Sequence, residues 1–173
     1  ELSEERGTDA AGIAYNSGGS LRIDKHPGAA HTLNFRVPRD SAVVMGHTRM
    51  TTQGSALKTQ NNHPFAGNAQ GMPFALAHNG ALYNDCLLRK TLKLPNTNIE
   101  TDSYVAVQLI EQAKALNFSS LRYMAEEVEG SFCFTVLDRK NNLYIVKGDN
   151  PFCLVHYPEK GIYLYTSTER ILG

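Results

Sequence analysis

The stretch Phe132-Cys133-Phe134-Thr135-Val136-Leu137 is apolar at nearly every position. Residues 42–45 and 74–77 are similar short apolar runs. A strand of an antiparallel sheet with one face in water alternates between apolar and polar side chains, and these runs do not alternate. They therefore indicate β-strands that are covered on both faces.

Two amphipathic helices are available to provide part of that cover. The helix that follows Asp102 has one apolar stripe, while Gln108, Glu111 and Gln112 face away from it. The stripe consists of Val105, Ala106, Leu109, Ile110 and Ala113. A second helix carries Leu121, Met124, Ala125 and Val128 and ends at Gly130. Two packed antiparallel sheets with helices outside satisfy these patterns, so the sequence predicts an α+β fold, a four-layer αββα sandwich.

The first half of the chain contains shorter elements around irregular segments. Residues 12–15 and 21–23 flank Asn16-Ser17-Gly18-Gly19 and predict a β-hairpin. Residues 29–35 predict a short helix. Residues 50–73 have little periodicity, and an irregular stretch of that length in a compact domain usually forms a functional loop.

The remaining expected elements are one helix and four strands. Asn84 is expected to cap a helix that carries Leu87, Leu88 and Leu92 and stops before Pro95. The strand candidates cover residues 131–137, 143–147, 152–157 and 162–166. Short turns separate these strands, which predicts antiparallel neighbours.

Composition excludes several classes of protein. Lys plus Arg and Asp plus Glu both number 17, and a formal net charge of +0 argues against nucleic-acid or membrane surfaces. The apolar runs are too short to span a bilayer, and no signal peptide is visible. Cys86, Cys133 and Cys153 lack metal-site spacing, and we expect them to be reduced thiols in a cytoplasmic protein. The length predicts a single domain over residues 1–173.

Four polar clusters follow the apolar strands, at residues 46–54, 61–64, 78–80 and 101–102. A free amino acid carries an ammonium and a carboxylate, so its site needs an opposite charge for each. Arg49 can hold a carboxylate through two parallel hydrogen bonds, and Asp102 can bind the ammonium. Asn79 and the Gly80 N–H can stabilise an oxygen that becomes anionic during acyl transfer. The clusters together could bind and cleave an amino-acid amide.

Each of these residues also has an ordinary structural explanation. Arg49 could form a structural salt bridge, and Asp102 could cap a helix. Asn79-Gly80 could be a tight turn, and Thr52 could be a loop hydroxyl. The complete set at strand and helix ends is what favours a binding site.

Three histidines, His47, His63 and His78, raise the question of a metal. Their spacing matches no compact zinc signature, so we expect neither a metal nor a cofactor. His63 precedes Pro64 and is expected to support the loop. His78 is expected to bond backbone near the end of its strand.

The motifs resemble those of a class II glutamine amidotransferase domain, a member of the N-terminal nucleophile hydrolases. Residues 46–54 resemble the family's glutamine loop and residues 62–65 the segment after it. His78-Asn79-Gly80, with Leu82 and Asn84, resembles the oxyanion motif, and Thr101-Asp102-Ser103 the third motif. Residues 6–12 resemble its Arg-Gly-x-Asp-Ser-x-Gly stretch, and residues 129–132 and 166–169 its later strands. The resemblance covers nearly the whole chain in the same order.

The resemblance implies an αββα fold and hydrolysis of L-glutamine to glutamate and ammonia. Arg49 would bind the α-carboxylate with help from Thr52, and Asp102 would bind the α-ammonium with help from Gly80. Asn79 and the Gly80 N–H would form the oxyanion hole. The implied partners are L-glutamine and an ammonia-accepting synthase domain or subunit.

The nucleophile of this family is a cysteine at the mature N-terminus, and its own α-amino group serves as the base. A free α-amine has a pKa of about 7.7–8.0, so it can take a proton near neutral pH. Residues 1–5 resemble the end of the family's first helix, so we expect the strand that begins with this cysteine to be missing and the domain to be truncated at its N-terminus. The cysteines at 86, 133 and 153 cannot substitute by position.

Two other functions remain open at this stage. One is a non-catalytic module that binds glutamine or another amino acid and has lost the nucleophile. The other is an N-terminal nucleophile hydrolase that acts on a different amide.

Overall fold

The computed structural model describes residues 2–172, which form three antiparallel sheets and three α-helices. The first sheet has the order β2–β1–β3 and consists of β1 (Ala10–Ser17), β2 (Ser20–Pro27) and β3 (Val44–Arg49). The second has the order β4–β5–β6–β7 and consists of β4 (Phe65–Ala69), β5 (Met72–Leu82), β6 (Gly130–Asp138) and β7 (Leu143–Lys147). The third pairs β8 (Cys153–Tyr157) with β9 (Ile162–Thr166).

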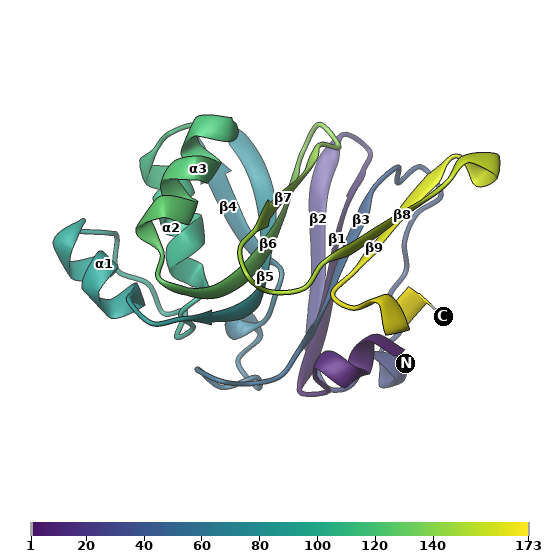
Figure 1. The fold of residues 1–173 in the computed structure, drawn as a ribbon, viewed down its shortest axis with the longest axis horizontal. Helices are drawn as coiled ribbons and strands as arrows, with labels where there is room; N and C mark the ends of the chain where they lie inside the picture. Colours follow the sequence, from purple (N-terminus) through teal and green to yellow (C-terminus); the bar gives the residue numbers. More distant parts are fainter. Residues whose placement is uncertain (1, 173) are drawn as a thin grey trace.

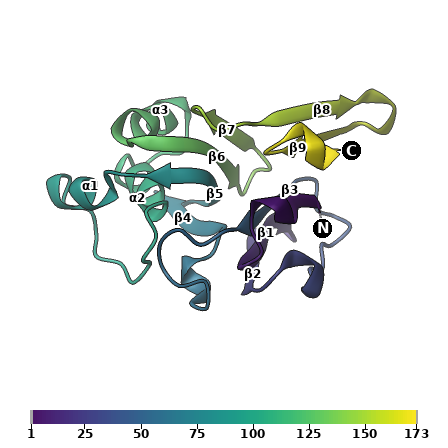
Figure 2. The same ribbon diagram turned by 60° about the horizontal axis from the view of Figure 1, so that its bottom comes forward.

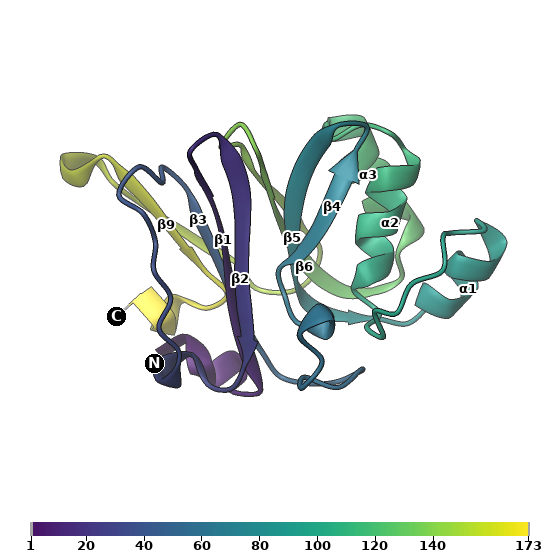
Figure 3. The ribbon, with the colours of Figure 1, turned by 180° about the vertical axis from the view of Figure 1, so that it is seen from behind.

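The two larger sheets pack face to face, and the α-helices cover the outer face of the β4–β7 sheet (Figure 1). The helices are α1 (Asp85–Thr91), α2 (Tyr104–Gln112) and α3 (Phe118–Glu127). The β8–β9 hairpin lies beside β3 and extends beyond it, and it is clear of the helices in Figures 2 and 3. Within residues 2–172, the chain therefore supplies both sheets and one helical layer of the sandwich.

Short 3₁₀-helices lie near both ends of the described chain. η1 (Leu2–Arg6) contacts β3 and also η5 (Glu169–Leu172), so the two ends of the described chain lie close together (Figure 1). Arg170 Nε and Glu5 Oε1 are 3.1 Å apart. The other 3₁₀-helices are η2 (Ala30–Thr32), η3 (Thr59–Asn61) and η4 (Pro158–Lys160).

Two apolar cores correspond to the two interfaces between layers. The larger core lies between the β4–β7 sheet and the helices and includes Phe65, Phe74 and Phe134. The smaller core lies between the sheets and consists of Ala14, Met45, Ala75, Ala77 and Leu137. Three alanines among five residues allow the sheets to approach closely where the functional strands β3 and β5 face each other.

The main sequence predictions of fold are confirmed. The two larger antiparallel sheets and the α-helices form the predicted α+β sandwich, and residues 2–172 supply three of the four layers expected for αββα. β1 and β2 form the predicted hairpin, and the turn contains Gly18 and Gly19 with φ of 57° and 73°, as a two-residue turn with two positive φ values requires. α3 carries most of the predicted apolar residues, and it begins at a capping box of Asn117 and Ser120 that the sequence analysis did not predict.

Some predicted boundaries are wrong because pairing and packing outside the segment decide them. Residues 29–35 form only η2, which has no buried residue to stabilise a longer helix. Residues 50–73 are not irregular throughout, since they contain β4 and the start of β5. β3 and β5 do not end before their motifs: β3 continues as far as Arg49, and β5 continues through residues 78–80 and pairs with β6 as far as Leu82.

Further details differ from the sequence predictions. β7 and β8 are not neighbours, and residues 148–152 cross from one sheet to another. Gln108 is buried rather than facing outward because its Nε2 donates to Pro95 O at 2.7 Å. Asn84 makes no capping bond, and its side chain instead bonds the backbone of Glu127 and Glu129. Ala113 and Leu87 are exposed.

Between residues 2 and 172, no helix is both long enough and apolar enough to cross a membrane.

Candidate functional site

The candidate site lies on an edge of β5 that β4 leaves open. β4 pairs with the first part of β5, from Met72 to Leu76, and β5 then continues to Leu82. Beyond Leu76, β5 is paired with β6 on its other side. The predicted oxyanion residues Asn79 and Gly80 therefore lie in a strand that has one free edge.

Alternate residues of β5 direct their backbone groups to this free edge. In an antiparallel strand, the N–H and C=O of one residue point to the same side, and those of the next residue point to the other. Pro73 O accepts from Arg139 N at 3.2 Å, and Tyr83 N donates to Glu129 O at 2.8 Å, so odd-numbered residues face β6. Even-numbered residues, including Gly80, therefore face the open edge.

The backbone groups on both sides of Gly80 are already bound by side chains. His47 Nε2 contacts His78 O at 2.9 Å, and Leu82 N donates to Asp102 Oδ2 at 2.6 Å. Gly80 lies between these two contacts. Its N–H is therefore directed toward the space between His47 and Asp102, where it can act as an oxyanion donor.

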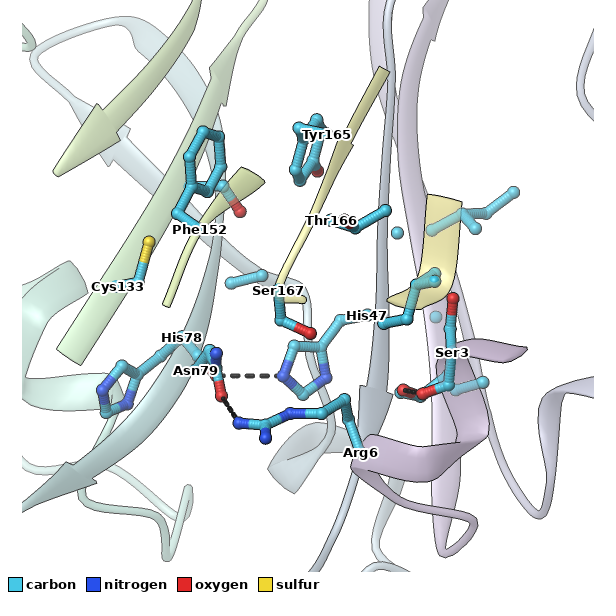
Figure 4. Close-up of a pocket in the computed structure, with 18 of the residues that line it drawn as sticks. Ser3, Arg6, His47, His78, Asn79, Cys133, Phe152, Tyr165, Thr166 and Ser167 are labelled. Carbon is cyan, nitrogen blue, oxygen red and sulfur yellow. Dashed lines mark hydrogen bonds between the residues drawn. The ribbon is translucent and has the colours of Figure 1, made fainter. Parts of the chain in front are cut away.

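The side chain of Asn79 supplies a second unpaired donor. Arg6 Nη2 donates to Asn79 Oδ1 at 2.8 Å (Figure 4). A guanidinium only donates, so this contact fixes the oxygen toward Arg6 and the amide nitrogen away from it. Nδ2 of Asn79 is buried and has no hydrogen-bond partner within residues 2–172. A buried, unpaired donor of this kind is well suited to an anionic oxygen.

Position 80 requires glycine for two reasons. Its φ of +146° is in a region that other residues rarely adopt. A Cβ would also lie 1.9 Å from Ser131 O and 2.8 Å from Asn150 Nδ2. Gly80 is therefore needed for its close approach to Ser131 and Asn150. Asn79 and Gly80 lie inside β5 and do not form the tight turn that the sequence left open.

Asp102 is held in place by backbone and hydroxyl donors. It is 5% exposed, its Oδ2 accepts from Leu82 N, and Ser103 Oγ lies 3.3 Å from its Oδ1. Ser103 Oγ is also 2.8 Å from Nδ1 of His78. α2 begins at Tyr104, so Asp102 does not cap this helix. Its carboxylate is instead tied to the same strand as the oxyanion donors.

Arg49 ends β3 and organises the loop that follows. Its Nη1 donates to Asn62 Oδ1 at 2.7 Å, and its Nη2 donates to the carbonyl oxygens of Gln53 and Gly54 at 2.6 and 3.1 Å. Burial lowers the pKa of Arg49, while the charges of Asp9 and Asp102 act in the opposite direction. Asp102 and Arg49 are thus close enough to act on each other electrostatically.

The loop covers Arg49 in this structure, so Arg49, Asp102 and Asn79 do not line one common cavity. Arg49 is only 4% exposed. A cavity of about 460 Å³ reaches Asn79 and Gly80 from the side of β3 and β9, and Arg49 and Asp102 are not among its lining residues. Thr52 is exposed on the loop. The loop would have to shift for a carboxylate to reach the guanidinium.

The three histidines pack behind the site as neutral rings. The ring centroids of His47 and His63 are 4.2 Å apart, and His78 stacks on Phe134 at 4.4 Å. Burial lowers the pKa of His47 and of His78 to about 4, and lowers the pKa of His63 well below its ordinary value. His78 bonds Ser103 and contacts Ser131 O at 3.3 Å. Within residues 2–172, no cluster of His, Cys, Asp or Glu side chains could hold a metal ion.

One cysteine lies closer to the site than its place in a late strand suggested. Cys133 is the register partner of Asn79, and it lines the same cavity (Figure 4). Burial raises the pKa of the Cys133 thiol, which disfavours the nucleophilic thiolate. Cys86 is exposed on α1, and Cys153 begins β8.

Sequence reasoning did not assign roles to several residues that the structure places at the site. Arg6 orients Asn79, and Asp9 accepts from Thr51 N at 2.7 Å where the loop begins. Lys25 Nζ donates to Asn62 O at 2.6 Å, behind Arg49. Arg6 and Asp9 belong to a motif that the sequence had singled out, whereas nothing in the sequence marked Lys25.

Solved structures show the class of fold. A structure of glutamine phosphoribosylpyrophosphate amidotransferase from B. subtilis matches 88% of this chain and 34% of its own, with a TM-score of 0.74 and 21% identity. A predicted glutamine amidotransferase from Pseudomonas aeruginosa matches 87% of this chain and 64% of its own, with a TM-score of 0.58 and 20% identity. The fold is that of the N-terminal nucleophile type of amidotransferase.

Sequence relatives show the family. The family described as glutamine amidotransferase domain matches residues 47–172. The chain is 32% identical over 173 residues to glutamine–fructose-6-phosphate aminotransferase (isomerizing) of Halalkalibacterium halodurans, covering 96% of this chain and 28% of the relative. It is 28% identical over 177 residues to 7-cyano-7-deazaguanine synthase of Sulfolobus acidocaldarius, covering 96% of this chain and 37% of the relative. The chain belongs to the glutamine amidotransferase domain family, in its class II branch.

Proposed function

We propose that this domain hydrolyses the side-chain amide of L-glutamine and passes the ammonia to a synthase domain or subunit. The observation that carries the proposal is the open edge of β5. Within residues 2–172, Asn79 Nδ2 is buried without a hydrogen-bond partner, and the Gly80 N–H next to it is directed to an edge where Asp102 accepts from Leu82 N. The chain spans 28% and 37% of the length of the two curated relatives described above. That a synthase domain or subunit accepts the ammonia is therefore part of what we propose.

Each donor has a defined role in this reaction. A cysteine thiolate attacks the amide carbon, and the carbonyl oxygen gains negative charge that Asn79 Nδ2 and the Gly80 N–H stabilise. The C–N bond then breaks, and the nitrogen leaves as ammonia with the proton that the α-amine took from the thiol. Water hydrolyses the thioester and releases glutamate and the thiol.

The two charged groups on the α-carbon of glutamine would select it as the substrate. Asp102 would bind the α-ammonium, and Arg49 the α-carboxylate, with Thr52 closing from the loop. A guanidinium has five N–H groups, and the three hydrogen bonds that Arg49 makes to Asn62, Gln53 and Gly54 leave two N–H groups for the substrate. His63 would support the loop that follows Arg49, and His78 would support the end of β5.

The nucleophile is proposed to be a cysteine with a free α-amine, entering the cavity between β3 and β9. Ser3 and Arg6 line one part of this cavity, and Asn79 lines another (Figure 4). A residue placed there would lie next to both oxyanion donors.

The test is to isolate the protein from its natural source and determine its N-terminus by mass spectrometry. We expect an N-terminal cysteine, glutamate release from L-glutamine, and covalent labelling of that cysteine by a γ-diazoketone analogue of glutamine. A native N-terminus without cysteine, together with no glutamate release, would contradict the proposal.

A second function, amino-acid binding without turnover, is favoured by the state of the cysteines in the described chain. Cys86 is exposed on α1, and burial raises the pKa of the Cys133 thiol. Calorimetry with L-glutamine and L-glutamate separates the two functions. Binding without glutamate release from the native protein supports the binding module, whereas turnover excludes it.

A further inference from the structure

We propose that Asn150 is a positioning residue for the oxyanion hole, an inference that rests on the proposed function. Asn150 lies in the connection between β7 and β8, far from the motifs in sequence. Its Nδ2 donates to the backbone oxygen of Asn79 at 2.6 Å. That oxygen belongs to the peptide group that also carries the Gly80 N–H.

This contact fixes the direction of the catalytic donor. In a trans peptide group, the C=O and the N–H are coplanar and point in opposite directions. When Asn150 holds the Asn79 oxygen on the β6 side, the Gly80 N–H must point to the other side. The other side is the open edge of β5, between His47 and Asp102.

Gly80 makes a further contact useful at this point of the strand. Glycine rotates more freely than any other residue, and Gly80 has a φ of +146°. β4 does not hold this part of β5, since its pairing ends at Leu76, whereas β6 pairs with it on the other side, where Cys133 is the register partner of Asn79. Asn150 adds a side-chain donor to the Asn79 oxygen and so resists rotation of the peptide between Asn79 and Gly80.

The turn that carries Asn150 is itself anchored on β6. Gly148 N donates to Phe132 O at 3.0 Å, and Phe132 N donates to Asp149 Oδ1 at 3.2 Å. Phe132 is the register partner of Gly80. The turn is thus fixed to the residue opposite Gly80, and Asn150 is the member that reaches across to the oxyanion peptide.

The inference is tested with Asn150→Ala and Asn150→Asp in the native-length protein. The alanine variant loses the donor, and the aspartate variant replaces it with an acceptor that repels the Asn79 oxygen. We expect kcat for glutamate release to fall about tenfold for alanine and further for aspartate, with KM for glutamine changed less than twofold, because the oxyanion forms only in the transition state. A matched control is Asn68→Ala, which removes a similar turn contact to Gly71 N away from the site.

A second readout separates positioning from general stability. A protonated carboxyl can donate a hydrogen bond to the Asn79 oxygen, and an aspartate has a pKa of about 3.9, so the kcat of Asn150→Asp relative to the unaltered protein should recover as the pH falls from about 6 toward about 4.5. An unchanged kcat in both variants, or equal losses in Asn150→Ala and Asn68→Ala, would overturn the inference. Absence of glutamate release from the unaltered protein would instead contradict the proposed function.

Discussion

Replacing Arg49 with alanine should abolish recognition of the α-carboxylate while leaving the fold in place. Arg49 is 4% exposed and donates to Asn62 Oδ1, Gln53 O and Gly54 O. Gln53 is exposed and Gly54 is half-buried, so water can replace Arg49 at their carbonyl oxygens. Asn62 is fully buried, so its oxygen would lose its partner. One unsatisfied buried acceptor costs about 1–3 kcal/mol in the free energy of unfolding.

The expected loss in binding follows from the carboxylate contact. A charge-assisted hydrogen bond is worth about 1.5–3 kcal/mol, and two of them place the loss at about 3 kcal/mol or more. Since 1.4 kcal/mol corresponds to a factor of ten, the Kd for L-glutamine should rise by roughly 100-fold or more. The Kd for 4-aminobutanamide, which is glutamine without its α-carboxylate, should change little.

Calorimetric titration with both ligands is the assay, and Arg49→Lys provides a milder variant that keeps the charge. Arg122→Ala is the matched control, because the Arg122 side chain is 66% exposed on α3. Equal losses of affinity for both ligands would show that Arg49 only shapes the loop. Unchanged affinity for L-glutamine in Arg49→Ala would refute the carboxylate role.

Three further predictions concern the oxyanion residues and the buried histidines. Gly80→Ala should lower kcat for glutamate release at least 100-fold and lower the melting temperature, because its Cβ would collide with Ser131 O. Gly71→Ala is the control, because a Cβ at Gly71 meets open space. A kcat of Gly80→Ala within tenfold of that of the unaltered protein would contradict this prediction. Arg6→Ala should lower kcat about tenfold with little change in KM, since Asn79 could then flip its amide. In a protein that already carries Asn79→Ala, Arg6→Ala should leave kcat unchanged. Additive effects on kcat in the double variant would exclude this coupling. Folded-state pKa values near 4 for His47 and His78, against about 6.5 when unfolded, mean that the unfolded chain binds more protons below pH 6.5. In urea unfolding, the free energy of unfolding should therefore be highest above about pH 7 and should fall by up to about 1.4 kcal/mol per pH unit per histidine toward pH 4. A constant free energy of unfolding between pH 7 and pH 5 would show that the two rings take up protons as readily in the folded state as in the unfolded state.

The elements that the sequence predicted well are those set by local pattern. Gly18-Gly19 marked a turn because both residues need positive φ, and the stripe of Val105, Ala106, Leu109 and Ile110 marked the buried face of α2. The continuous apolar run at residues 132–137 indicated burial on both faces, and β6 indeed lies between the helices and the other sheet.

The parts that the sequence did not predict depend on contacts between distant segments. The motif residues lie inside β3 and β5 because pairing with β1 and β6 extends those strands past their apolar runs. The free edge of β5 exists because β4 begins only at Phe65, opposite Leu76, and no sequence pattern within β5 indicates this. Arg6 and Asn150 reach Asn79 across 73 and 71 residues of sequence. Polar contacts of that range have no periodic signature, so only the folded chain shows them.

The most direct test is a crystal structure of this chain with L-glutamine bound. We predict that the α-carboxylate lies on Arg49, the α-ammonium on Asp102, and the side-chain oxygen within hydrogen-bond distance of Asn79 Nδ2 and the Gly80 N–H. Glutamine bound elsewhere, or bound with its side-chain amide directed away from β5, would contradict the assignment of this edge as the glutaminase site.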